Sequence, residues 1–264
     1  MFGTLHVKYM QVLPDLLKQK GYNCQAEIVE KNMELLQKAV QAPDSDYQEY
    51  QIFFDLIPAE LRKRIPRTSP IKFEHVLVDD VPKEIEDVLK KICSRFGIKY
   101  RYADETVNEW YKQAKELWPI DRQRALEKIG RCCHLIQDIC VPMHVRVLAN
   151  LCDVFDVFKN RDRNHNKYEK YCEEVFKLRN LLFDINTFEV PQTLREIAKE
   201  TRTYIEMCDG IKFDSLWYSI LKMLKIVKAN EDYKTAADYS NLAAQVNTVL
   251  FVLTFFKEVG VCAT

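Results

Sequence analysis

The chain has 264 residues, of which 47% are hydrophobic, and this length and content suit one buried core. Its 39 basic and 39 acidic side chains give a formal net charge of zero, which argues against a strongly attractive surface for nucleic-acid backbone or anionic membrane. An anionic substrate would then need a local attraction, which bound metal ions supply without altering the sequence charge. We expect a single domain over residues 1–264.

The sequence predicts an all-α protein, a single-domain multi-helix bundle. Only six glycines occur, which argues against a turn-rich β architecture. Apolar residues recur at helical spacing in these stretches: Ile28 to Val40, Ile85 to Phe96, Val107 to Leu117, Ala125 to Cys140, Tyr168 to Leu181, Leu194 to Met207, Leu216 to Val227 and Ala236 to Phe256. Most prolines fall between the stretches, and the segment from Asp44 to Val81 reads as a long loop.

Cysteine content and apolar runs indicate the cellular compartment of the chain and whether it crosses a membrane. The nine cysteines include no CxxC pair, so we expect mostly buried, free thiols and a reducing compartment. No signal peptide is recognised after Met1, which favours a cytoplasmic location. The longest apolar run, Val249 to Phe256, is far below the ~20 residues of a membrane span, so we expect a core helix and no transmembrane segment. No obligate protein partner is evident.

Two histidines each precede a carboxylate by four residues, which places both side chains on one face of a helix. His134 and Asp138 form one pair, and Pro142 should end their helix so that His144 lies just past the break. His165 and Glu169 form the second pair. Alone, each pair is more often a surface or solvated pair than a metal site. Together they favour zinc, which accepts nitrogen and oxygen ligands and can keep one position open for water.

The stretch from Cys133 to His144, with His134, Asp138 and then Pro-Met-His, resembles the signature of the bacterial zinc-dependent phospholipase C enzymes and the related single-strand-specific zinc nucleases. His165 to Glu169 resembles the second motif of that superfamily, His-Ser-x-Tyr-Glu. Other positions are similar to the Asp-Tyr pair, the upstream histidine and the amino-terminal histidine of the phospholipases: Asp46-Tyr47, His75 and His6. The resemblance extends to a carboxy-terminal apolar helix, Ala243 to Phe256, and implies a bundle of the zinc phospholipase C type.

The resemblance implies a trinuclear zinc cluster, and we expect two or three zinc ions in this chain. It assigns three sets of ligands: Asp46, His75, His134 and Asp138 to the first ion, His144, His165 and Glu169 to the second, and Asp138, His6 and the amino-terminal residue to the third. In the family that residue is a Trp, whereas here Met1 lies five residues before His6, as in the nuclease branch. The chain also carries Gln137 where the family usually has Gly, and Val141 where it usually has Gln.

The activity implied is hydrolysis of a phosphodiester by metal-bound hydroxide, with Asp46 either a ligand or the general base, and Tyr47 either lining the substrate pocket or packed in the core. Pro142-Met143-His144 and Glu169 favour the phospholipase branch and a phospholipid substrate. Nucleic acid is the alternative substrate, of a single-strand-specific zinc nuclease or nucleotidase. A non-catalytic metal-binding protein on the same fold is the third hypothesis. Because proteins of the family it resembles are commonly secreted, secretion is the alternative to a cytoplasmic location.

Overall fold

The computed structural model describes residues 3–45, 102–145, 168–180, 188–190, 192–205 and 233–261, with four single residues between 87 and 94. The elements within these ranges are helices, with no strand among them. They are α1 (Gly3–Gln19), α2 (Asn23–Lys31), α3 (Met33–Ser45), α7 (Ala103–Leu117), α8 (Arg122–Ile139), the 3₁₀ turn η2 (Pro142–His144), α10 (Gln192–Arg202) and α13 (Tyr233–Glu258). Residues 168–174 are also helical. The prediction of an all-α fold is confirmed.

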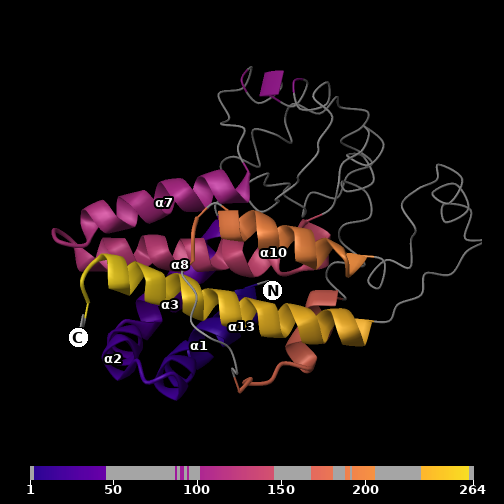
Figure 1. The fold of residues 1–264 in the computed structure, drawn as a ribbon, viewed down its shortest axis with the longest axis horizontal. Helices are drawn as coiled ribbons and strands as arrows, with labels where there is room; N and C mark the ends of the chain where they lie inside the picture. The colour runs from indigo at the N-terminus through magenta and orange to yellow at the C-terminus, as the bar shows by residue number, and fades with distance from the viewer. Residues whose placement is uncertain are drawn as a thin grey trace, which may run out of the picture.

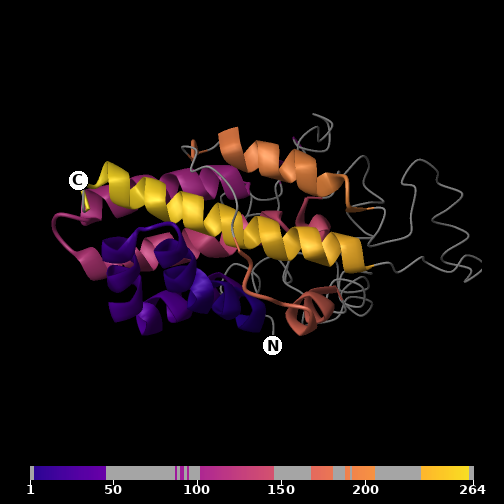
Figure 2. The same ribbon diagram turned by 60° about the horizontal axis from the view of Figure 1, so that its bottom comes forward.

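Helix α8 is the central element of the bundle. It packs against α3, α7, α10 and α13, whereas α1 packs against α2, α3 and α13. In Figure 1, α13 and α8 run side by side along the long axis, with α7 on one side of them and α1 to α3 on the other. Figure 2 shows the same grouping, with α1 to α3 beneath α13. Side chains of α8 therefore meet residues from several distant parts of the sequence.

The ends of α8 follow from its flanking residues. Asp121 caps the amino terminus, because its side chain accepts a hydrogen bond from the Arg124 backbone N–H at 3.1 Å. At the other end, Val141 is extended (φ −100°, ψ 120°), as expected of a residue before proline, and Pro142 opens η2. The predicted helix end near Cys140, with His144 just beyond it, is confirmed.

Glycine 130 allows α8 to approach α3 closely. A Cβ atom added at Gly130 would lie 2.6 Å from the Cβ atom of Ala39 and 3.3 Å from the Leu36 carbonyl oxygen. Only a residue without a side chain fits this contact unless α3 shifts. One turn further along α8, the same approach brings His134 against the carbonyl of Val40.

Helix α13 closes the bundle as a core helix, as the sequence predicted. Among the described helices it is the one long and apolar enough to cross a membrane, yet 67% of its most apolar 18-residue window is buried inside the molecule. Phe251, Phe255 and Phe256 are fully buried. Phe255 and Phe256 contact the Trp118 ring, which lies just after α7.

Several predicted boundaries were wrong. The stretch from Ile28 to Val40 is two helices, because α2 ends before Asn32 and α3 begins at Met33. The predicted helix from Tyr168 to Leu181 is helical only over 168–174, since residues 176–180 are extended or irregular. Pro43, expected in the loop after a helix, lies within the last turn of α3.

Helix α1 was not predicted, although its apolar residues have helical spacing. Pro14 lies inside the helix and cannot donate to the carbonyl four residues earlier. Leu13, Leu16 and Leu17 are almost completely buried, and their burial offsets the lost hydrogen bond. The predicted stretches Ile85 to Phe96 and Leu216 to Val227 lie outside the described residues, apart from four helical positions in the first.

The cysteines follow the expectation only in part. Cys132, Cys133, Cys140 and Cys172 are buried thiols that form no disulfide, as predicted. Cys24, at the start of α2, is instead disulfide-bonded, so the prediction of free thiols was wrong at this position.

Candidate metal centre

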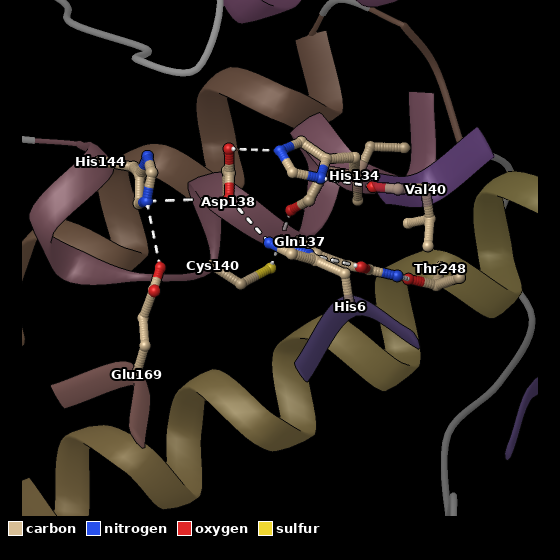
Figure 3. Close-up of polar contacts among 10 residues, drawn as sticks. His6, Val40, His134, Gln137, Asp138, Cys140, His144, Glu169 and Thr248 are labelled. Atoms are coloured by element: carbon tan, nitrogen blue, oxygen red, sulfur yellow. Dashed lines mark hydrogen bonds and ion pairs between the residues drawn. The ribbon is translucent and has the colours of Figure 1, made fainter. Parts of the chain in front are cut away.

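Helix α8 presents His134 and Asp138 from one face, one turn apart. The Nε2 atom of His134 lies 3.2 Å from Oδ2 of Asp138, and both side chains are buried. The Nδ1 atom of His134 makes a 2.6 Å hydrogen bond with the Val40 carbonyl oxygen of α3. Figure 3 shows the imidazole held between these two partners. The pairing predicted from the four-residue spacing is present.

Histidine 6 of α1 reaches the same carboxylate. Its Nε2 atom lies 3.4 Å from Oδ1 of Asp138, and its ring centroid is 4.1 Å from that of His134. Its Nδ1 atom lies 2.9 Å from Oε1 of Gln137. His6, His134 and Asp138 each offer a ligand atom, and these atoms all lie within 4.8 Å of one another.

Histidine 144 and Glu169 extend the cluster on the other side of Asp138. The η2 turn carries His144, whose Nε2 atom is 3.7 Å from Oδ1 of Asp138 and 3.7 Å from Oε1 of Glu169. Glu169 lies in the helical residues 168–174 and is the most exposed of the five, with 14% of its side chain accessible. Asp138 is thus the group between the His6–His134 side and the His144–Glu169 side (Figure 3).

The hydrogen-bonding groups of His134 favour a cation at this point. A carbonyl oxygen only accepts, so Nδ1 of His134 must carry the hydrogen in its bond to Val40. In a neutral ring, Nε2 then presents a lone pair to a carboxylate oxygen that also only accepts. Protonating both His134 and His6 would place two like charges on adjacent rings. A single bound cation would accept the lone pairs of both rings and of Asp138.

The distances also suit zinc. Two ligands about 2.0–2.1 Å from a tetrahedral zinc ion lie roughly 3.3 Å apart. The Nε2 atom of His134 lies 3.2 Å from Oδ2 of Asp138, and that of His6 lies 3.4 Å from Oδ1, so each histidine is close to that value from one oxygen of the carboxylate. Imidazole nitrogen and carboxylate oxygen are ligands that zinc accepts. The ligand chemistry of the described residues therefore fits zinc, and their ligand atoms lie close enough together to hold one metal ion.

The thiol and phenol nearest the cluster keep their protons. Burial raises the pKa of Cys140, which donates to the Ile136 carbonyl oxygen at 3.3 Å. Burial likewise raises the pKa of Tyr9 well above its usual value, and nearby Cys172, Cys140 and Glu169 raise it further. The Tyr9 hydroxyl donates to Oδ1 of Asn241 at 2.7 Å. Among the described residues, the imidazole nitrogens of His6 and His134 and the carboxylate of Asp138 are the groups that could hold a metal ion.

The structure brings together four of the residues named by the two principal motifs, together with His6. The remaining predicted site residues lie outside the described residues: Met1, Asp46, Tyr47, His75 and His165. Their assigned roles stay predictions, as do the roles of the residues whose positions are known.

Sequence reasoning missed the groups that hold the histidines in place. These are the Val40 carbonyl, which binds His134, and the Gln137 amide, which binds His6 and is itself bound by Thr248 of α13. A backbone carbonyl leaves no signal in the sequence. Gln137 did leave one, because a polar residue between His134 and Asp138 in a fully buried turn needs partners.

Comparison with known proteins shows the fold. No family model matches the sequence, and no curated protein matches it. Among solved structures, the chain is similar to the alpha-toxin of Clostridium perfringens from avian strain SWCP, a zinc phospholipase C, with a TM-score of 0.51 and 17% identity. The similarity covers 98% of this chain and 63% of the toxin chain, so this chain spans less than two thirds of the toxin's length. The chain therefore has an all-α, multi-helix fold that is similar to the matched part of the toxin chain.

Proposed function

We propose that the chain is a zinc-dependent phosphodiester hydrolase of the phospholipase C kind, with two or three zinc ions. The observation that carries the proposal is the convergence of three buried imidazole Nε2 atoms, from His6, His134 and His144, within 3.2–3.7 Å of one carboxylate. The similarity of fold to a zinc phospholipase C supports it. A buried cluster of three imidazoles and two carboxylates is costly for a structural core, and a bound cation would offset that cost.

The described residues divide between two neighbouring ions. His6, His134 and Asp138 would hold one ion, and His144 and Glu169 would contribute to a second, with Asp138 between the two. Zinc, when bound, supplies positive charge that would neutralise the phosphodiester oxygens, lower the pKa of a bound water and stabilise the leaving oxygen. The assignments of Asp46, His75, His165 and Met1 as further ligands, and of Asp46 as general base, complete the proposal from the sequence.

The surrounding residues would keep the ligands in one arrangement. Val40 fixes the ring of His134 through Nδ1, and Gln137 does the same for His6. Almost complete burial of His134 and Asp138 excludes water from their side of the cluster. Glu169 is the described member with the greatest access to solvent, so the His144–Glu169 side is where substrate would approach.

A phospholipid is the substrate we propose. The net charge of zero gives little support to a dedicated nucleic-acid groove, and Glu169 matches the phospholipase motif. Tyr47 is the residue proposed to line the headgroup pocket. A single-strand nuclease activity is the alternative that the assay must separate.

The test measures zinc per chain by elemental analysis and hydrolysis of a water-soluble phosphatidylcholine beside single-stranded DNA. Glu169→Gln is the variant of interest, and Glu173→Gln is its matched control. Glu173 lies one turn along the same helical segment, but it pairs with Lys8 at 3.3 Å instead of with the cluster. We expect Glu169→Gln to lower turnover by at least ~100-fold and Glu173→Gln to leave it near wild type.

Each outcome separates one hypothesis from the others. Cleavage of DNA alone would overturn the phospholipid preference and leave the hydrolase class intact. A zinc-loaded chain inert toward both substrates and toward phosphomonoesters would support a non-catalytic metal-binding protein. A chain that binds no zinc would contradict the proposal as a whole.

A further inference from the structure

Gln137 is a completely buried amide located within the candidate metal centre but outside its ligand set. It lies on α8 between His134 and Asp138, and its exposed fraction is 0%. Its side chain extends from α8 to residues of α1 and α13 (Figure 3). Its carboxamide joins His6 on one helix to Thr248 on another.

The contacts of Gln137 fix which way its amide points. The Nε2 group lies 3.2 Å from Oγ1 of Thr248 and 3.9 Å from Sδ of Met10. A thioether sulfur accepts hydrogen bonds and donates none, so the amide N–H₂, and not the carbonyl, belongs on the Met10 side. The carbonyl oxygen Oε1 must then face His6, 2.9 Å from Nδ1.

The orientation of the amide in turn fixes the tautomer of His6. Oε1 only accepts, so Nδ1 of His6 carries the hydrogen and donates it. In the neutral ring, Nε2 is left with a lone pair, and Nε2 is the atom 3.4 Å from Oδ1 of Asp138. The opposite tautomer would place a hydrogen on the nitrogen that the ion needs.

We propose that Gln137 is a positioning residue that holds His6 in the Nδ1–H tautomer, and so presents Nε2 as a metal ligand. This inference rests on the proposed zinc site. Partners of this kind on the second nitrogen of a ligating histidine set both the tautomer and the orientation of the ring. The chain carries Gln137 at a position where the family it resembles usually has glycine, which has no side chain to bind His6.

The alternative is a purely structural role, in which Gln137 only fills space between α1, α8 and α13. If Gln137 only fills space, the shape of its side chain matters; if it positions His6, its hydrogen-bond acceptor matters as well. Gln137→Met keeps an unbranched side chain of similar length but removes the carbonyl acceptor. Gln137→Glu keeps an acceptor oxygen for His6, and carboxylates commonly partner zinc-bound histidines. If only packing matters, the two variants should behave alike.

The first measurement is the tautomer of His6 in the zinc-free protein, read from the ¹⁵N chemical shifts of its ring. The wild type and Gln137→Glu should have hydrogen on Nδ1, whereas Gln137→Met should show a mixture of tautomers. Thr248→Val is the second variant. It leaves Gln137 in place and removes the hydroxyl that anchors the amide, so it should shift the same signals in the same direction but less.

The second measurement is zinc affinity by competition with a chromophoric chelator. We expect Gln137→Met to weaken binding of the ion held by His6 by ~10–100-fold, and Gln137→Glu to restore it to within a few-fold of wild type. Near-UV circular dichroism checks that the variants fold. Should Gln137→Met not fold, the Thr248→Val shifts and affinity provide the test.

The outcomes distinguish this inference from the proposed function. Wild type that binds no zinc would overturn both. Zinc-loaded wild type with equal affinity in Gln137→Met would overturn only the role of Gln137, as would hydrogen on Nε2 of His6 in the zinc-free protein. Loss of affinity in Gln137→Met, with recovery in Gln137→Glu, supports the assignment.

Discussion

The two halves of α8 bury their residues in different ways. In residues 122–131, burial follows the helical period: Ala125, Leu126, Ile129 and Gly130 are buried, whereas Arg122 and Arg124 are exposed. From residue 132 to the helix end at Ile139, and at Cys140 directly after it, every side chain is buried, including those of His134, Gln137 and Asp138. One half is an amphipathic helix and the other is surrounded on all sides.

The difference shows that the buried polar side chains of α8 are concentrated in its second half. Apolar side chains of the first half need only a surface to pack against, whereas polar side chains of the second half need specific partners. Those partners come from α1, α3 and α13. The second half is thus the part of α8 in which a single substitution should have the largest effect.

Asp138→Asn should produce the largest change, because it removes the charge on which three imidazoles converge. With zinc present, we expect the free energy of unfolding to fall by ~3–5 kcal/mol and zinc uptake to be lost. Urea unfolding and elemental analysis measure these effects. The matched control is Asp121→Asn at the other end of the same helix, where asparagine caps nearly as well as aspartate. Equal stability losses in the two variants would contradict the contrast between the halves.

Gly130→Ala should have the next largest effect, in the amphipathic half. The added methyl group would lie 2.6 Å from the Cβ atom of Ala39 and push α3 away, at a cost of ~1–3 kcal/mol in unfolding free energy. Since Val40 adjoins Ala39, zinc binding through His134 should also weaken. The double variant Gly130→Ala/Ala39→Gly should show a favourable coupling of at least ~0.5 kcal/mol in a double-mutant cycle. Strict additivity would show that the two helices do not meet as described.

Stability should also fall at high pH, and the buried thiols of the second half contribute to this fall. Burial raises the pKa of Cys132, Cys133 and Cys140 above the usual value near 9.0. Below pH 9 both folded and unfolded thiols keep their protons, whereas above it only the unfolded chain loses them, which favours unfolding. Each thiol should lower the unfolding free energy by ~1.4 kcal/mol per pH unit.

Urea unfolding from pH 7 to pH 10 measures that slope. Cys132→Ala should make it shallower by the contribution of one thiol, whatever the variant's stability at pH 7. A slope identical to that of wild type would mean that the Cys132 thiol ionises as readily in the folded chain as in the unfolded one.

Asp121→Ala should have the smallest effect of the set. It removes the cap at the start of α8 and should lower the unfolding free energy by about 1 kcal/mol. Zinc affinity should stay at the wild-type value, because the cap lies at the far end of the helix from His134. A drop in zinc affinity larger than two-fold would show that the cap at Asp121 is coupled to the candidate metal ligands.

The sequence predicted the all-α fold and the position of α8 because both depend on local patterns. Apolar spacing marked α8, and Pro142 marked its end and set His144 beyond it. Helix α1 was missed because Pro14 interrupts its pattern, and the break at Asn32 was missed because no proline or glycine marks it. In both cases tertiary packing outweighs the local signal. The single-domain organisation stays a prediction.

The spacing of residues in the sequence predicted part of the candidate site, but not the hydrogen bonds that hold its histidines in place. Residues four apart on a helix lie on the same face, so the contact between His134 and Asp138 could be predicted from the sequence. His6 was assigned through a family resemblance alone, and Glu169, which its spacing paired with His165, was grouped with His144 only through that resemblance, because nothing local brings distant helices together. The hydrogen bonds from Val40 and Gln137 depend on how α3 and α1 pack against α8, which a single sequence does not reveal.

The most direct test of the zinc site is anomalous diffraction at the zinc absorption edge, on crystals of the zinc-loaded protein. The account predicts an anomalous peak about 2.0–2.1 Å from Nε2 of His6, Nε2 of His134 and an oxygen of Asp138. Zinc bound only to surface residues, with no peak among these three side chains, would contradict it.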